Sequence, residues 1–126
     1  EVPVPQAVLR VRDRSGRVVR QLEPETMGRA IEGETARTVG EIMRDVVDDG
    51  TGTQAQIPGV QVAGKTGTAE TGRAGENDAW FIAFAPADAP RIAISVVVEG
   101  TPDTGGQVAA PIAARVLRAL GVGGTG

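Results

Sequence analysis

The sequence contains no cysteine, no histidine and no tyrosine. Without cysteine the chain can form no disulfide, and thiolate-based zinc or iron–sulfur sites are excluded. Without histidine, no Ser-His-Asp or Cys-His catalytic arrangement can be assembled from this chain. We therefore expect neither a metal nor a cofactor.

Long apolar runs and an excess of positive charge are also lacking. No run of about 18 apolar residues is present. The formal net charge of −3 gives no support for nucleic-acid binding, which requires a basic face. The 126 residues suit one small domain with a modest core. The residues from Glu1 onward do not read as a signal peptide, and we expect the chain to be cut from a larger protein.

The first half of the chain predicts a hairpin followed by a helix. Residues 8–11 and 17–22 read as strands around a turn at residues 13–16, and residues 23–33 as an irregular connection. Residues 35–49 have helical periodicity and predict an amphipathic helix. Its expected apolar stripe consists of Ala36, Val39, Ile42, Met43, Val46 and Val47.

The second half predicts three strands and a second helix. The strands are expected at residues 60–69, 79–85 and 91–99, and the helix at 107–120. The last two strands are nearly continuous in apolar residues, which predicts burial on both faces. The expected apolar side of the helix is Val108, Ile112, Val116, Leu117 and Leu120.

These elements predict an α+β fold: an antiparallel sheet of about three main strands with flanking helices. Residues 1–121 would form part of one larger domain, and residues 122–126 a disordered tail.

Residues 59–66 match the P-loop pattern GxxxxGK[ST], so nucleotide binding is a candidate function. A P-loop follows a buried strand, and residues 54–58 do not read as one. Its Lys-Thr pair also opens a helix, whereas Gly67 and Gly72 follow here and disfavour a helix. These features disfavour the P-loop interpretation, and nucleotide binding stays as an alternative.

Lys65 is the only lysine among thirteen cationic residues. Lysine is a compact point charge, unlike the planar guanidinium of arginine. Beside it, threonine hydroxyls could bind a carboxylate, and a glycine in a strand lets another backbone approach closely. A strand edge offers main-chain groups to an extended peptide. These features predict a platform for a peptide with a free carboxylate; a polar edge strand with a solvated lysine is the alternative.

Lys65-Thr66-Gly67 is the third motif of the penicillin-binding protein and serine β-lactamase superfamily. Residues 57–70 and 78–86 resemble the class B penicillin-binding proteins, as do residues 46–52 and 109–113. The resemblance spans roughly residues 5–120. Within the class it is strongest to the penicillin-binding protein A group of actinobacteria, and it implies the C-terminal part of a larger transpeptidase fold.

The resemblance implies roles for four residues. Lys65 would sit beside the catalytic serine and lysine and assist proton transfer electrostatically. Thr66 and Thr68 would bind the carboxylate of a D-Ala-D-Ala stem peptide or of a β-lactam antibiotic. The backbone N–H of Thr68 would be an oxyanion-hole donor, and Gly67 would keep the wall clear of the acyl group.

Neighbouring residues are expected to be structural. Trp80 is predicted to pack in the core, although substrate contact is an alternative. Glu70, Glu76 and Asp78 lie around the loop that would border the cleft, and we expect them to be surface charges and not catalytic acids.

The chain departs from the family pattern in one respect. The family requires SxxK and SxN motifs, and neither Ser15 nor Ser95 begins one. We expect the nucleophile to lie in an N-terminal half of the domain preceding Glu1, so that this chain alone is inactive. The parent would be a peptidoglycan D,D-transpeptidase of cell wall synthesis, anchored at the extracytoplasmic face of the bacterial membrane.

Other functions remain open at this point. One is a D,D-carboxypeptidase or β-lactamase of the same superfamily, and another is a non-catalytic folding or interaction module. Exposed strand edges also predict self-association of the isolated chain.

Overall fold

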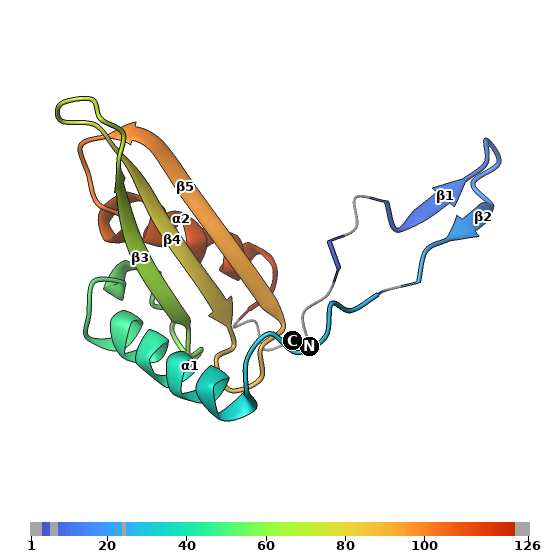
Figure 1. Cartoon of the computed structure of the whole chain (residues 1–126), viewed down its shortest axis with the longest axis horizontal. Helices are drawn as coiled ribbons and strands as arrows, with labels where there is room; N and C mark the ends of the chain where they lie inside the picture. Colours follow the sequence, from blue (N-terminus) through green and yellow to red (C-terminus); the bar gives the residue numbers. More distant parts are fainter. Residues whose placement is uncertain (1–3, 6–7, 24, 123–126) are drawn as a thin grey trace. The chain divides into compact units, whose positions relative to one another are not determined.

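The structure is a computed structural model that describes residues 4–5, 8–23 and 25–122 (Figure 1). The chain divides into two units, Glu1–Ala36 and Arg37–Gly126. Within the described residues, no helix has the length and apolar character needed to cross a membrane.

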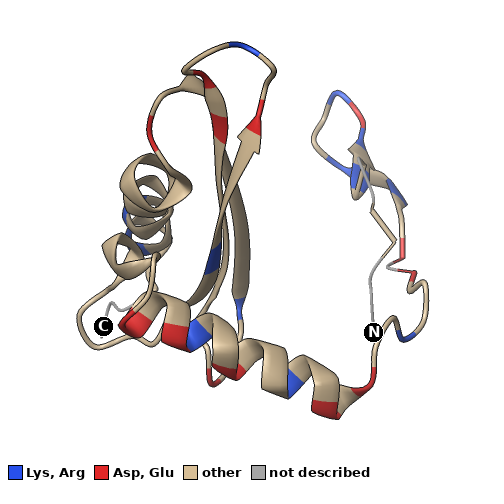
Figure 2. Cartoon of the chain, turned by 60° about the vertical axis from the view of Figure 1, so that its left-hand side comes forward, with Lys and Arg blue, Asp and Glu red and all other residues tan. Residues whose placement is uncertain are grey.

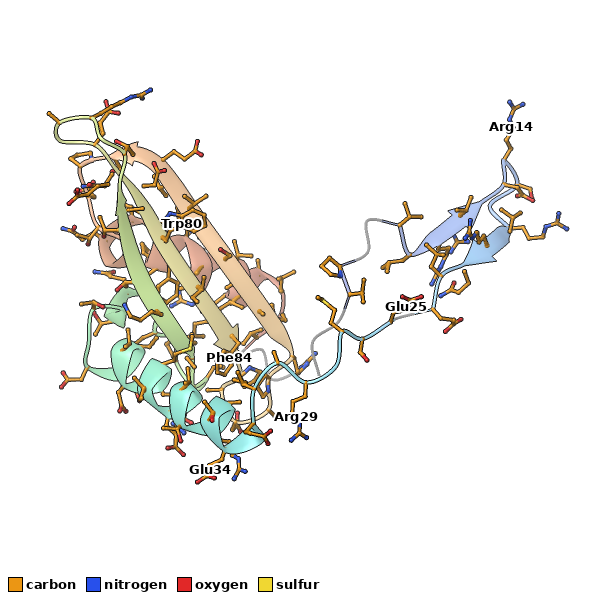
Figure 3. All side chains as sticks on the ribbon, viewed as in Figure 1. Arg14, Glu25, Arg29, Glu34, Trp80 and Phe84 are labelled. Carbon is orange, nitrogen blue, oxygen red and sulfur yellow. The ribbon has the colours of Figure 1, made fainter. Side chains whose placement is uncertain are left out.

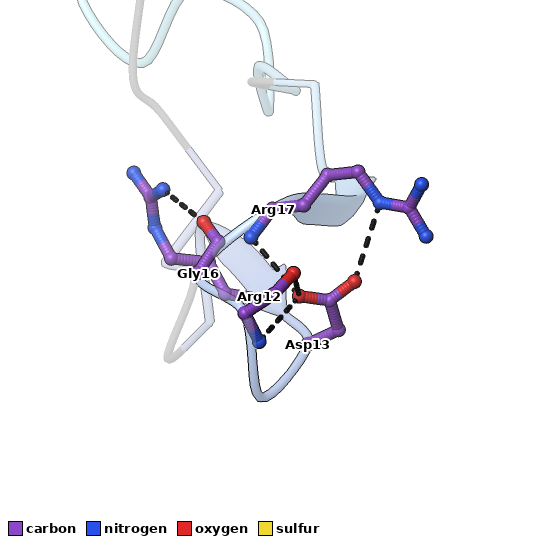
Figure 4. Close-up of polar contacts among 5 residues, drawn as sticks. Arg12, Asp13, Gly16 and Arg17 are labelled. Carbon is purple, nitrogen blue, oxygen red and sulfur yellow. Dashed lines mark hydrogen bonds and ion pairs between the residues drawn. The ribbon is translucent and has the colours of Figure 1, made fainter.

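The first unit contains the predicted hairpin, with shorter strands. β1 (Arg10–Arg12) pairs antiparallel with β2 (Val18–Gln21), and the register shifts between Val11 and Arg12. Every residue of both strands is exposed. Asp13 closes the connecting turn by accepting hydrogen bonds from Ser15 and Arg17 (Figure 4).

The predicted first helix is confirmed as α1 (Gly33–Asp48). Its apolar stripe is covered only at the C-terminal end, where Val47 is 1% exposed. Val39 and Ile42 are 46% and 57% exposed. The described part of the chain therefore buries only one end of the stripe that the periodicity predicts.

The second unit is built on the predicted three-stranded antiparallel sheet, which confirms the α+β prediction. β3 (Ala63–Glu70), β4 (Asn77–Ala85) and β5 (Ile92–Thr101) lie in the order β3-β4-β5 (Figure 1). The expectation that the first of these strands starts at residue 60 was wrong. Val60 forms an isolated bridge with Ile57 across a tight turn, which removes it from the strand.

The two faces of the sheet differ, which corrects the prediction that both are buried. Along β4, Ala79, Phe81 and Ala83 are buried, whereas Trp80 and Ile82 on the opposite face are 40% and 47% exposed. Trp80, which is labelled on β4 in Figure 3, therefore does not pack in the core. Successive side chains of a strand point to opposite faces, so a continuous apolar run does not require two covered faces.

The predicted second helix is confirmed as α2 (Gly105–Ala119), which contacts β4 and β5 on the buried face of the sheet (Figure 1). Its predicted apolar side was largely wrong, because Ile112, Val116 and Leu120 are 41%, 40% and 59% exposed. Small residues face the sheet instead and allow the helix to pack closely. The buried positions beyond the first turn are Ala109, Ala110, Ala113, Ala114 and Leu117.

The predicted disordered tail was wrong at its first residue. Val122 is 5% exposed and belongs to the core, and its N–H donates to the carbonyl of Leu117 at 3.1 Å. Residues 123–126 lie outside the described residues.

Candidate functional site

Residues 65–68 lie in the middle of β3, an edge strand that pairs only with β4 among the described residues. Upstream, Gly64 packs so closely on Phe81 that an added Cβ would lie 3.0 Å from ring atom Cε2. β3 continues through Glu70, so the Lys-Thr pair does not open a helix. The strand geometry is incompatible with a P-loop, which argues against the nucleotide-binding alternative.

The strand divides the motif between the two faces of the sheet. Lys65 pairs with Ile82 and Gly67 pairs with Trp80, so Lys65 shares the open face with these two side chains. Thr66 pairs with Phe81 and lies on the α2 side. The exposed Lys65 Nζ donates to the carbonyl of Thr66 at 2.7 Å.

A pocket of about 220 Å³ lies on the α2 side of β3 and is rich in hydroxyl groups. Three of the four predicted site residues line it, and Lys65 does not. The hydroxyls of Thr51 and Thr66 lie 2.7 Å apart and share a hydrogen bond. Its lining residues are Thr51, Thr66, Gly67, Thr68, Thr104 and Gly106.

Sequence reasoning missed Thr51 and Thr104 as members of this pocket. Thr51 follows the C-terminus of α1, and Thr104 directly precedes α2. The Thr104 N–H and hydroxyl both donate to the side-chain oxygen of Gln107, at 3.0 and 2.8 Å. An N-terminal Thr with Gln three residues later is a capping-box pattern; it could have placed Thr104 at a helix start, but not beside β3.

Among the described residues, no hydrogen bond links either serine to Lys65. Ser95 on β5 pairs with Ile82 on β4, which in turn pairs with Lys65 on β3. Two strand spacings separate the Cα atoms of Ser95 and Lys65 by roughly 10 Å. Ser15 lies in the turn of the hairpin, where its hydroxyl donates to Asp13 at 2.6 Å.

Two of the three acidic residues around the β3–β4 loop make structural contacts. Glu76 pairs with Arg73 at 3.4 Å, and Asp78 accepts a hydrogen bond from the N–H of Gly100 at 3.1 Å. Glu70 is exposed at the end of β3. The described residues contain no group of three or more acidic side chains placed to hold a metal ion.

The family model described as "Penicillin binding protein transpeptidase domain" matches residues 4–118. This chain belongs to the penicillin-binding protein transpeptidase family. The resemblance inferred from the motifs is thereby confirmed, and the match covers both the pocket and β3.

Named relatives agree with this assignment. The peptidoglycan D,D-transpeptidase PbpA of Mycolicibacterium smegmatis is 42% identical over 103 residues, which cover 76% of this chain and 21% of that protein. The PbpA of Mycobacterium tuberculosis is 54% identical over 70 residues, or 50% of this chain and 14% of that protein. The chain therefore spans about a fifth or less of the length of these relatives.

A solved structure has the same fold. The ceftriaxone acyl-enzyme complex of penicillin-binding protein A from Mycobacterium tuberculosis superposes with a TM-score of 0.79 at 36% identity. The match covers 88% of this chain and 26% of that one. The arrangement of sheet and helices described above is thus part of a transpeptidase domain fold.

Proposed function

We propose that this chain is the substrate-binding part of a peptidoglycan D,D-transpeptidase. The observation that carries the proposal is the Lys65-Thr66-Gly67 triplet on the open edge of β3, beside a pocket lined by threonine hydroxyls. An open edge can pair with an extended peptide, and hydroxyl donors suit a terminal carboxylate. The ligand is therefore the D-Ala-D-Ala end of a stem peptide, or a β-lactam.

Four residues along this edge have different roles in binding and catalysis. Thr66 and Thr68 hydrogen-bond the carboxylate from the pocket, and the backbone N–H of Thr68 stabilises the oxyanion. Lys65, on the opposite face, supplies positive charge and assists proton transfer. Gly67, between them, presents no side chain to the acyl group. The ligand lies along the strand edge, where groups from both faces are within reach.

The covalent step depends on residues outside this chain. The acylated serine and its lysine belong to the N-terminal half of the same domain, in a longer protein anchored at the extracytoplasmic face of the bacterial membrane. The length of the relatives supports this, since the chain covers 14–21% of the PbpA proteins. The chain alone contributes one wall of the site and no nucleophile.

Labelling with a fluorescent penicillin tests the proposal. We expect the longer protein containing this chain to be labelled covalently and the isolated 126-residue chain to remain unlabelled. Lys65→Gln in the longer protein should slow acylation by about 10²-fold or more, because it removes the positive charge at the site.

Arg115→Gln is the matched control, since it removes the same charge from an exposed position of α2. Its labelling rate should equal that of the unmodified protein. Covalent label on the isolated chain, or equal rates for Lys65→Gln and the control, would refute the proposal.

A further inference from the structure

Two glycines at the start of α2 lie unusually close to the backbone of the site. A Cβ added to Gly105 would overlap the carbonyl oxygen of Trp80 and lie 2.7 Å from that of Gly67. A Cβ added to Gly106 would overlap the carbonyl oxygen of Thr51. Real Cβ atoms do not approach backbone oxygens so closely. A side chain at Gly105 would therefore force α2 away from β3 and β4, and one at Gly106 would force it away from Thr51.

The contact at Gly105 acts on one particular peptide group. The Gly67 carbonyl and the Thr68 N–H belong to the same planar unit. Trp80 lies on β4 and is the cross-strand partner of Gly67. The carbonyl oxygens of both residues lie close to the same point, the position of a Cβ at Gly105. The two oxygens are therefore near each other, which requires the Gly67 oxygen to lie on the β4 side of β3. The two groups of an extended peptide point to opposite sides, which directs the Thr68 N–H to the free edge.

The contact at Gly106 reaches the adjacent residue by another route. Gly106 packs on the backbone of Thr51, and the Thr51 hydroxyl shares a 2.7 Å hydrogen bond with the Thr66 hydroxyl. Thr66 itself lies near Gly106, since its Cγ2 would be 3.5 Å from an added Cβ. The first turn of α2 therefore contacts β3 at two consecutive residues, Thr66 and Gly67.

Beyond these contacts, the two residues are held by pairing with β4 on one side only. β3 lacks a second partner strand among the described residues, and Gly67 has no side chain to pack. We infer that Gly105 and Gly106 are positioning residues that fix the tilt of the Gly67–Thr68 peptide and so aim its N–H at the reacting carbonyl. This inference rests on the proposed function, since it concerns the same oxyanion donor.

The test separates binding from chemistry in the longer protein that contains this chain. Stopped-flow acylation by a chromogenic cephalosporin gives the dissociation constant of the initial complex and the acylation rate constant separately. For Gly105→Ala we expect the rate constant to fall about tenfold, a part of the 10²–10³-fold loss seen when an oxyanion donor is removed. The dissociation constant should change less than about twofold, because most contacts with the ligand persist.

Gly33→Ala is the matched control, because it adds the same methyl group where nothing lies within 4 Å. It should leave both constants unchanged. The inference would be overturned by a folded Gly105→Ala protein whose acylation rate constant is unchanged, whether or not its dissociation constant is raised. Failure of the unmodified protein to acylate would instead reject the proposed function.

If Gly105→Ala fails to fold, as thermal melting would report, Thr51→Val decides the question. Thr51 is exposed, and this change removes the hydroxyl that it shares in a hydrogen bond with Thr66 while retaining the shape of the side chain. We expect a severalfold slower acylation, and recovery in Thr51→Ser. Equal acylation rates for Thr51→Val and the unmodified protein would overturn the inference.

Discussion

Asp13 is the acceptor around which the β1–β2 turn is organised. Its Oδ1 accepts hydrogen bonds from the Ser15 hydroxyl at 2.6 Å, the Ser15 N–H at 2.9 Å and the Arg17 N–H at 3.0 Å (Figure 4). The hydrogen bond from the Ser15 hydroxyl is the largest cause of a lowered Asp13 pKa, although partial desolvation opposes it. The ionised carboxylate therefore favours the closed turn.

The lowered pKa of Asp13 predicts that the hairpin weakens in acid. A carboxyl whose pKa is lower folded than unfolded contributes stability above the unfolded pKa and loses it as the pH falls through the folded one. Pairing of β1 with β2 should therefore weaken as the pH falls below 3.8, the ordinary pKa of an aspartate side chain. The backbone NMR chemical shifts of the cross-strand partners Val11 and Arg20, recorded as the pH is lowered, would report this loss of pairing.

Asp13→Asn is the control for this titration, because asparagine keeps a turn-forming side chain but has no ionisable group. Its hairpin shifts should be independent of pH over the same range. An identical acid transition in both proteins would show that another group controls the hairpin.

Single residues of the site differ in how far the sequence could reveal them. Lys65, Thr66, Gly67 and Thr68 are contiguous, so a motif could find them, and their common strand could be predicted. Thr51 could not be assigned to the same pocket, because its contact with Thr66 joins residues 15 positions apart. Such a contact depends on how α1 ends and how β3 packs, which local patterns do not encode.

At the scale of elements, α2 shows where helical periodicity fails. Its bulky residues Ile112 and Val116 suggested the packed side, but alanines are what the sheet contacts. The charged residues of α2 are Arg115 and Arg118, whereas α1 carries both acidic and basic residues along its length (Figure 2). Hydrophobicity alone ranks valine above alanine, whereas a close helix–sheet approach requires small side chains.

Overpacking the alanine face of α2 should destabilise the second unit. Ala113 is 0% exposed, so Ala113→Leu would force three additional carbons between α2 and the sheet. Overpacking a filled core costs about 1–3 kcal/mol of unfolding free energy, measurable by urea denaturation with circular dichroism.

Ala119→Leu is the matched control, since the same substitution falls on an exposed position of the same helix. Its free energy of unfolding should change by less than about 0.5 kcal/mol. Equal stabilities for the two variants would mean that the alanine face is not the packed one.

At the scale of the molecule, the described residues cover the face of the sheet away from α2 only in part. Trp80, Ile82 and Val97 are 40%, 47% and 40% exposed on the face away from α2. A shallow hollow of about 390 Å³ on that face includes Ile82, Phe84 and Ser95, with Met43 from α1. An apolar face of this kind, next to an open strand edge, favours contact with further protein.

We therefore predict that the isolated chain self-associates, whereas the longer protein that contains it does not. Association would cover the apolar face and the free edge of β3, which the remainder of a transpeptidase domain would otherwise cover. Sedimentation velocity across the micromolar range should show an average mass that rises with concentration.

Ile82→Lys should reduce this association, because it places a charge at the centre of the face, whereas Ile112→Lys on the outer side of α2 should not. A chain that remains monomeric throughout, or that responds equally to both substitutions, would exclude the open sheet face as the contact.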